Sequence, residues 1–246
     1  GINDDCEITL EANPDSVNKE MDYMLSFAKA NAEMERFLLL RFVNRYYSQK
    51  YMWEDAVFVH LYEKYFATNP PSWLSEQGKK TITDRAYSLM ANIFGSPASE
   101  IQLPDTAGKS SSLYGLKKEY TLVVFWDPLC GHCKETLPRI DSVYNARWSK
   151  QGLGIYAVAK ENEGSKTDWL KFIKEKNIGH WSHVYYSKEA EKERVSNNVP
   201  GYSQLYDVQS FPTLYLLDKD KRIVAKKLSF EQIDEILQLK LKEKAK

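Results

Sequence analysis

Apolar residues recur at helical spacing through the first third of the chain. The first stripe predicts one face of a helix and consists of Val17, Met21, Met24, Leu25 and Ala28. Similar stripes run through residues 33–47, 58–65 and 82–93, and the 33–47 stretch is apolar on nearly every side. We therefore expect an all-α helical bundle over residues 1–95, with the 33–47 helix buried at its centre.

The hydrophobic period changes after Gly95. Continuous apolar runs at residues 120–126 and 153–159 are typical of strands that are buried on both faces of a sheet. Further strands are expected at 181–186, 214–217 and 222–225, and helices at 131–149 (bent by Pro138), 167–178 and 230–242. Strands that alternate with helices predict a second domain over residues 96–246, with a central mixed sheet flanked by helices.

Two cysteines follow the 120–126 run, as Cys130-Gly-His-Cys133 at the predicted start of a helix. Side chains three residues apart on a helix face the same way, which brings the two sulfurs close enough for a disulfide. The first sulfur also lies near unpaired backbone N–H groups and the positive end of the helix dipole, which favour its thiolate. This spacing predicts a reversible dithiol–disulfide couple.

Composition narrows the function further. The chain has 34 basic residues (lysine plus arginine) and 34 acidic residues (aspartate plus glutamate). Nucleic-acid binding usually requires a basic surface, so this neutral total gives it no support. No stretch approaches the roughly 20 apolar residues of a membrane span. Three cysteines are too few for a disulfide scaffold, and we interpret Cys6 as an unpaired, half-exposed thiol.

Two separated motifs resemble the thioredoxin superfamily. The first is Phe125-Trp126 followed by Cys130-Gly-His-Cys133-Lys134, and the second is Tyr206-Asp-Val-Gln-Ser-Phe-Pro212-Thr-Leu. The segment Ile101-Gln-Leu-Pro-Asp and an insertion ahead of the Pro212 strand are similar to the TlpA/ResA branch, the thiol–disulfide oxidoreductases of the bacterial cell envelope. The resemblance implies an α/β thioredoxin-like fold, preceded by a helical domain of undefined role.

This resemblance also implies a site. It makes Cys130 the nucleophile that attacks a substrate disulfide and Cys133 the thiol that resolves the mixed disulfide. It places Pro212, after a cis peptide bond, beside the sulfurs, with the neighbouring backbone pairing with the substrate as an added strand. Substrate-binding or tuning roles fall to Trp126, Gly131, His132, Phe211 and Thr213.

The implied partners are protein thiols or disulfides and an upstream reductant or oxidant. No metal and no cofactor beyond the Cys130–Cys133 disulfide is expected. The resemblance further implies export to the bacterial cell envelope or periplasm. The stretch from Tyr120 to Lys134, with a helical domain ahead of it, is similar to a subgroup of this branch whose members are often exported lipoproteins. A lipid anchor upstream of the chain is therefore possible.

Gly131-His132 is the dipeptide found between the cysteines of protein disulfide isomerase. A protonated histidine there can stabilise the Cys130 thiolate, which makes the disulfide a stronger oxidant. We therefore expect a redox potential nearer to about −180 mV than to about −270 mV. The alternative is that His132 is only an exposed helix residue.

The sequence does not identify the proton acceptor for Cys133. Val124 stands where thioredoxin carries a buried aspartate, and Thr136 stands where some envelope relatives carry a glutamate. Glu161, beyond the second strand, is a weak candidate, and a water molecule or a substrate group is equally open.

Three other functions compete with this interpretation. A zinc site would have to join the cysteine pair to His180 and His183, whose spacing does not suit a zinc finger. Thiol-dependent peroxidases share the fold, but Asp127 stands where they carry the threonine of a Thr-x-x-Cys turn. The helical domain could instead carry the main role by binding an envelope partner through exposed aromatic residues such as Tyr47, Tyr51 and Trp53.

Overall fold

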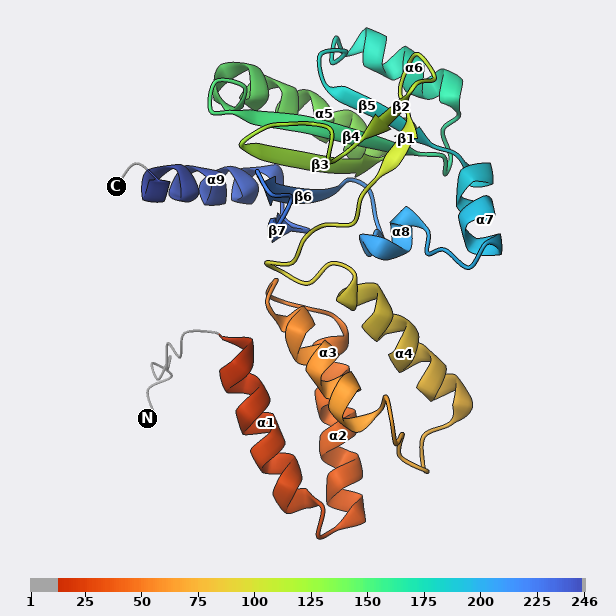
Figure 1. Ribbon diagram of the computed structural model, residues 1–246, viewed down its shortest axis with the longest axis vertical. Helices are drawn as coiled ribbons and strands as arrows, with labels where there is room; N and C mark the ends of the chain where they lie inside the picture. Colours follow the sequence, from red (N-terminus) through yellow and green to blue (C-terminus); the bar gives the residue numbers. More distant parts are fainter. Residues whose placement is uncertain (1–12, 245–246) are drawn as a thin grey trace. The chain divides into compact units, whose positions relative to one another are not determined.

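The structure is a computed structural model that describes residues 13–244. The chain divides into two compact units, Gly1–Ile93 and Phe94–Lys246, which are coloured red to gold and gold to blue in Figure 1. The division lies two residues before the boundary expected between residues 95 and 96. Cys6, which we interpreted as an unpaired thiol, lies outside the described residues.

The described part of the first unit, residues 13–93, contains four helices: α1 (Pro14–Ala28), α2 (Ala32–Tyr47), α3 (Glu54–Tyr65) and α4 (Glu76–Met90). Three of them begin at a residue whose side chain accepts a backbone N–H of the first turn, and these caps are Asn13, Asn31 and Ser75. Helix α3 contacts each of the other three. Its side chains Val57, Phe58 and Leu61 are almost completely buried, so the predicted helical bundle is present and α3 lies at its centre.

The prediction that the 33–47 helix is central to the bundle is wrong. Only Leu39 and Val43 of α2 are buried, while Met34 and Phe37 are 50% and 55% exposed. The reason lies in the charged residues of α2, which are Glu33, Glu35, Arg36, Arg41 and Arg45. Burying charged groups without partners costs free energy, so the face of α2 that carries them stays exposed to solvent. Met34 and Phe37, which lie among these charged residues, are exposed as well.

A buried carboxylate joins α2 to α3. Glu54 is 1% exposed, and its oxygens accept hydrogen bonds from the Arg45 guanidinium and from the backbone N–H of Lys50 (2.6 Å) and of Tyr51 (3.3 Å). Burial alone raises the pKa of Glu54, but Arg45 and the backbone donors outweigh it and hold the pKa below its ordinary value of 4.5. The carboxylate is therefore ionised at neutral pH and ties the two helices together.

The second unit is built on a five-stranded sheet in the order β5–β4–β3–β6–β7. Its strands are β3 (Tyr120–Trp126), β4 (Leu153–Lys160), β5 (Ser182–Tyr186), β6 (Thr213–Asp218) and β7 (Ile223–Lys226). The strands β3, β4 and β5 run parallel, whereas β6 and β7 pair antiparallel to their neighbours. Every residue of the central strand β3 is buried, as the sequence pattern predicted. The expected central mixed sheet is confirmed.

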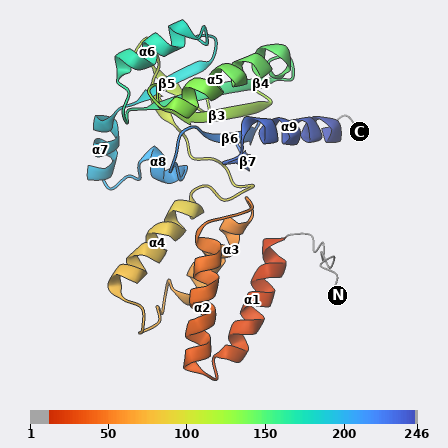
Figure 2. The same cartoon turned by 180° about the vertical axis from the view of Figure 1, so that it is seen from behind.

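Both faces of this sheet are covered (Figures 1 and 2). On one face, Leu103 and Leu113 pack with Val123 and Phe125 of β3, and the elements here are β1 (Gln102–Pro104), β2 (Ser110–Ser112) and α8 (Tyr202–Leu205). The opposite face carries three helices, α5 (Gly131–Val143), α6 (Lys166–Glu175) and α9 (Phe230–Lys244). These layers bury both faces of β3 and leave its carboxyl end as the place where α5 begins.

Two stretches differ from the predicted elements. The helix expected over 131–149 ends as an α-helix at Val143 and continues as a π-helical turn, η1 (Tyr144–Trp148). The stretch ahead of β6, where no element was predicted, contains α8 and also α7 (Lys188–Ser196). No residue of α7 is buried, so its sequence lacks the apolar periodicity that reveals a helix.

Candidate functional site

The turn between β3 and α5 holds the two cysteines. Cys130 is the N-cap residue of α5, with extended backbone angles (φ −62°, ψ 124°), and Cys133 lies in the first helical turn. The Cys130 N–H donates to the Asp127 carbonyl at 3.1 Å, and the Cys130 carbonyl accepts from the Lys134 N–H at 3.1 Å. One turn of backbone bonds thus ends the strand, starts the helix and places the first sulfur at the helix N-terminus.

The two thiols differ in exposure. Both are free thiols in the structure, with Cys130 partly exposed and Cys133 completely buried. Burial raises the pKa of the Cys133 thiol above its ordinary value of 9.0. Hydrogen bonding by the Asp127 backbone N–H partly offsets the rise, whereas the neighbouring Cys130 and the Asp127 carboxylate add to it. Cys133 therefore stays protonated at neutral pH, while Cys130 is the sulfur that another protein can reach.

The segment ahead of β6 faces Cys130. The Phe211–Pro212 peptide bond is cis, and the Cys130 thiol donates to the Phe211 carbonyl oxygen at 3.5 Å. Thr213 begins β6 opposite Phe125 of β3, and its hydroxyl donates to the Ser210 carbonyl at 2.6 Å. Residues 81 positions apart in the sequence are thereby brought together at the redox pair.

The other residues singled out by sequence lie at different depths. Gly131 and His132 are exposed beside the redox pair, and the adjacent Leu129 is 41% exposed. Trp126 is completely buried, with its ring 5.0 Å from that of Phe172. A substrate cannot touch Trp126 in this arrangement, so any effect of Trp126 on the site must pass through packing.

Asp127 is a site residue that the sequence analysis did not select for a role in disulfide exchange. It is 1% exposed, and its carboxylate accepts the backbone N–H groups of Leu129 (2.7 Å), Glu163 (2.7 Å) and Gly164 (3.2 Å). The Glu161 carboxylate, the weak candidate for the proton acceptor of Cys133, instead accepts the backbone N–H of Lys188 at 3.0 Å. Asp127 is the carboxylate whose charge acts on the Cys133 thiol. The signal in the sequence that could have identified Asp127 is an acidic residue directly after a strand that is almost entirely apolar.

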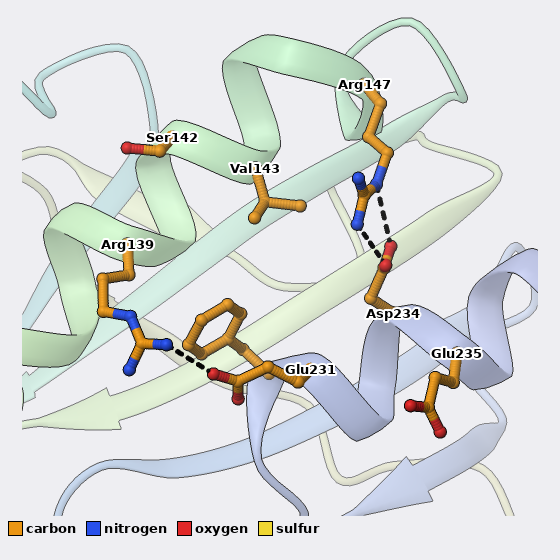
Figure 3. A pocket seen from close by; sticks show the side chains of 8 residues that line it. Arg139, Ser142, Val143, Arg147, Glu231, Asp234 and Glu235 are labelled. Carbon is orange, nitrogen blue, oxygen red and sulfur yellow. Dashed lines mark hydrogen bonds and ion pairs between the residues drawn. The ribbon is translucent and has the colours of Figure 1, made fainter.

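The far half of α5 and the η1 turn that continues it are held on α9 across a groove of about 460 Å³. Arg139 pairs with Glu231 at 2.8 Å, and Arg147 pairs with Asp234, on either side of Val143 (Figure 3). The Asp234 carboxylate also accepts the Trp148 indole N–H at 2.7 Å. These contacts fix the helix that carries the redox pair at its other end.

Within residues 13–244, no group of three or more His, Cys, Asp or Glu side chains is arranged to hold a metal ion. No helix in that range is long and apolar enough to cross a membrane.

A family model described as the AhpC/TSA family matches residues 94–226, which is more than half of the chain. A thioredoxin-like protein of Haemophilus influenzae is 33% identical over 125 residues. That match covers 50% of this chain and 63% of the Haemophilus protein, so the chain spans less than two thirds of its relative's length.

Solved structures extend the comparison. A domain of a possible thiol-disulfide isomerase from Cytophaga hutchinsonii is 34% identical, with a TM-score of 0.52, over 62% of this chain and 97% of that domain. A thioredoxin-like protein from Bacteroides caccae is 21% identical, with a TM-score of 0.70, over 92% of this chain and 77% of that one. The second likeness shows a common fold that includes most of the helical unit. The expected resemblance is confirmed: the chain belongs to the AhpC/TSA family and has a thioredoxin-like fold preceded by four helices.

Proposed function

We propose that this protein exchanges electrons with protein disulfides through Cys130 and Cys133. The observation that carries the proposal is the pairing of a reachable sulfur at the helix N-terminus with a buried one in the next turn. A structural disulfide gains nothing from such a difference in exposure, whereas an exchange reaction needs one sulfur that meets substrate and one that is shielded.

The proposed reaction has two steps. The Cys130 thiolate attacks one sulfur of the substrate disulfide, the substrate S–S bond breaks, and its other sulfur leaves as a thiolate that takes up a proton. Cys133 then loses its proton and attacks the Cys130 sulfur, which releases the first substrate sulfur and forms the Cys130–Cys133 disulfide. Two electrons have passed to the substrate, and a dithiol partner must return them to the protein. The reverse sequence oxidises a substrate dithiol.

Substrate contact is proposed at the exposed residues around Cys130. The Phe211 carbonyl lies 3.5 Å from the Cys130 sulfur and belongs to the segment that we propose pairs with an extended substrate chain. Three exposed residues flank this position: Leu129, Gly131 and His132. We therefore propose that the substrate contacts the site at these residues. Pro212 and Thr213 fix the backbone behind it.

Replacing Cys133 with alanine should trap the first intermediate. Without the resolving thiol, the mixed disulfide on Cys130 persists, because its only remaining exit is attack by an external thiol. Disulfide-linked adducts that collapse on reduction should then accumulate in cells that express the variant, and mass spectrometry would identify the substrates. The matched control is the Cys130→Ala, Cys133→Ala double variant, which should capture nothing; adducts of equal amount in the control would refute the assignment of Cys130 as the nucleophile.

Replacing His132 with alanine should make the Cys130–Cys133 couple more reducing. A cation beside Cys130 stabilises the reduced form, and its loss shifts the potential by about 30 mV for each 1.4 kcal/mol removed. Equilibration with a series of glutathione ratios measures this shift, and we expect the wild-type value near about −180 mV. An unchanged potential in the variant, or a wild-type value below about −260 mV, would show that His132 does not tune the pair.

Peroxide reduction by Cys130 is the second candidate, because peroxide-reducing enzymes share this fold. The intact second thiol favours disulfide exchange, and Asp127 is bound to backbone N–H groups at the position where those enzymes carry a threonine. Rapid consumption of hydrogen peroxide with a thiol donor, faster than reduction of a protein disulfide, would reverse this preference.

The resemblance to envelope oxidoreductases supports a place in the bacterial envelope or periplasm, where protein disulfides are available as substrates.

Partner binding by the helical unit is a separate proposal, supported by the 60% exposure of Tyr51 and the 55% exposure of Phe37. If deletion of residues 1–93 left the set of trapped substrates unchanged, the helical unit would not select them.

A further inference from the structure

The Asp127 side chain hydrogen-bonds the β4–α6 connection (residues 161–165) to the turn between β3 and α5, which we call the redox turn (residues 127–130). Both oxygens of the Asp127 carboxylate face this connection and accept the N–H groups of Glu163 and Gly164. One of them also accepts the N–H of Leu129, within the redox turn itself. A buried carboxylate with three backbone donors is well satisfied. Its removal would leave N–H groups of two chain segments without their acceptor.

The two segments approach so closely that only glycine fits at the contact. A Cβ atom on Gly164 would lie 2.4 Å from the Cγ atom of Pro128 and 2.9 Å from Oδ1 of Asp127. Gly164 does not have a positive φ angle, so the contact and not the backbone conformation requires glycine. Substitution by alanine would therefore push the two segments apart while leaving the Asp127 charge in place.

The same residue reaches the resolving sulfur from its other side. The Asp127 carbonyl accepts the Cys130 N–H at 3.1 Å, and hydrogen bonding by the Asp127 backbone N–H lowers the pKa of the completely buried Cys133 thiol against the larger rise caused by burial. An N–H donor stabilises negative charge on sulfur, and this charge develops when Cys133 gives up its proton to attack Cys130. The position of this donor depends on the turn that the Asp127 carboxylate holds.

We propose that Asp127 is a positioning residue for the resolving step, which locks the β4–α6 connection onto the redox turn and so fixes the backbone of the turn on which the position of Cys133 depends. The inference rests on the proposed disulfide exchange. It assigns Asp127 a role through backbone geometry, because its carboxylate oxygens are already occupied by N–H groups. Gly164 and Pro128 complete the clamp, which we define as the contact of Asp127 and Pro128 with Glu163 and Gly164.

The test separates the two chemical steps with one reagent. Reduced protein in excess over 5,5′-dithiobis(2-nitrobenzoate) releases one coloured thiolate when Cys130 attacks and a second when Cys133 resolves the adduct. Asp127→Ala and Gly164→Ala break the clamp from opposite sides, and both should slow the second release by about tenfold or more, while the first stays within about twofold of wild type. Asp127→Asn retains one acceptor oxygen and should recover part of the lost rate.

Asp168→Ala is the matched control. It removes a carboxylate in the first turn of α6, just after the connection, that caps the helix through Ser165 and makes no hydrogen bond to the redox turn, so its second release should match wild type. Equal slowing of both releases, or a second release as fast as wild type in Asp127→Ala and Gly164→Ala, would overturn the clamp. Failure of the wild-type protein to give a second release that Cys133→Ala abolishes would instead count against disulfide exchange itself.

Discussion

Replacement of Cys130 by serine is expected to reduce disulfide exchange by at least about a thousandfold. A serine hydroxyl is not ionised near neutral pH, and Cys133 cannot substitute for the missing nucleophile. The Cys133 sulfur is completely buried, and burial holds the pKa of its thiol above the ordinary value. The measurement is the rate of reduction of a protein disulfide substrate, with a regenerating dithiol in excess.

Two controls make the result specific to the nucleophile. Cys6→Ser removes the third cysteine and should leave the rate unchanged. The thermal unfolding midpoint of Cys130→Ser should stay within a few degrees of wild type, because the change is one atom at a partly exposed position. Retention of a tenth or more of the wild-type rate in Cys130→Ser would mean that another group performs the attack.

Replacement of Glu54 by alanine is expected to lower the unfolding free energy of the helical unit by about 3 kcal/mol. The change leaves Arg45 without its carboxylate and the N–H groups of Lys50 and Tyr51 without their acceptor. Arg45 is 36% exposed and can turn to water, so most of the loss comes from the buried side of the interaction. Urea unfolding followed by far-ultraviolet circular dichroism measures it. Glu63→Ala, an exposed position on the same helix, should change it by less than about 0.5 kcal/mol.

The Glu54 contribution should depend on pH in one direction. Its pKa is lower in the folded protein than the ordinary value of 4.5, so the folded state favours the ionised form. The stabilisation is then fully present above about pH 5 and is lost as the pH falls through the folded pKa. The difference between wild type and Glu54→Ala should shrink below about pH 4. A difference that stays constant from pH 7 to pH 3 would show that packing, and not the charge, accounts for the loss.

Local chemistry made much of the fold predictable. The run from Tyr120 to Trp126 is apolar except at Thr121, and it forms the strand that is paired on both sides and buried on both faces. The Gly95-Ser-Pro97 break ended the helical pattern within two residues of the division between the two units. Both features can be recognised from the sequence because each involves several consecutive residues with the same structural role.

The sequence-based predictions failed where contacts between distant segments determine which side chains are buried and which groups meet. The apolar side chains of α2 predicted a central helix, but its charged residues require water and α3 takes the centre. Helix α7 buries no side chain, so nothing in its sequence pattern distinguished it from a loop. In the sequence, Asp127 was considered only because it stands where peroxidases of this fold carry the threonine of the Thr-x-x-Cys turn. Its partners at Glu163 and Gly164 lie 36 and 37 residues away and become neighbours only in the folded sheet.

Disulfide exchange by this protein requires a reversible bond between the Cys130 and Cys133 sulfurs. The direct measurement is equilibration of the protein with reduced and oxidised glutathione over a range of ratios, followed by acid quenching and peptide mapping. We predict one reversible disulfide that joins Cys130 to Cys133, with a midpoint between about −270 and −120 mV. A pair that stays reduced at every ratio, or that forms only mixed disulfides with glutathione and no Cys130–Cys133 bond, would contradict the account.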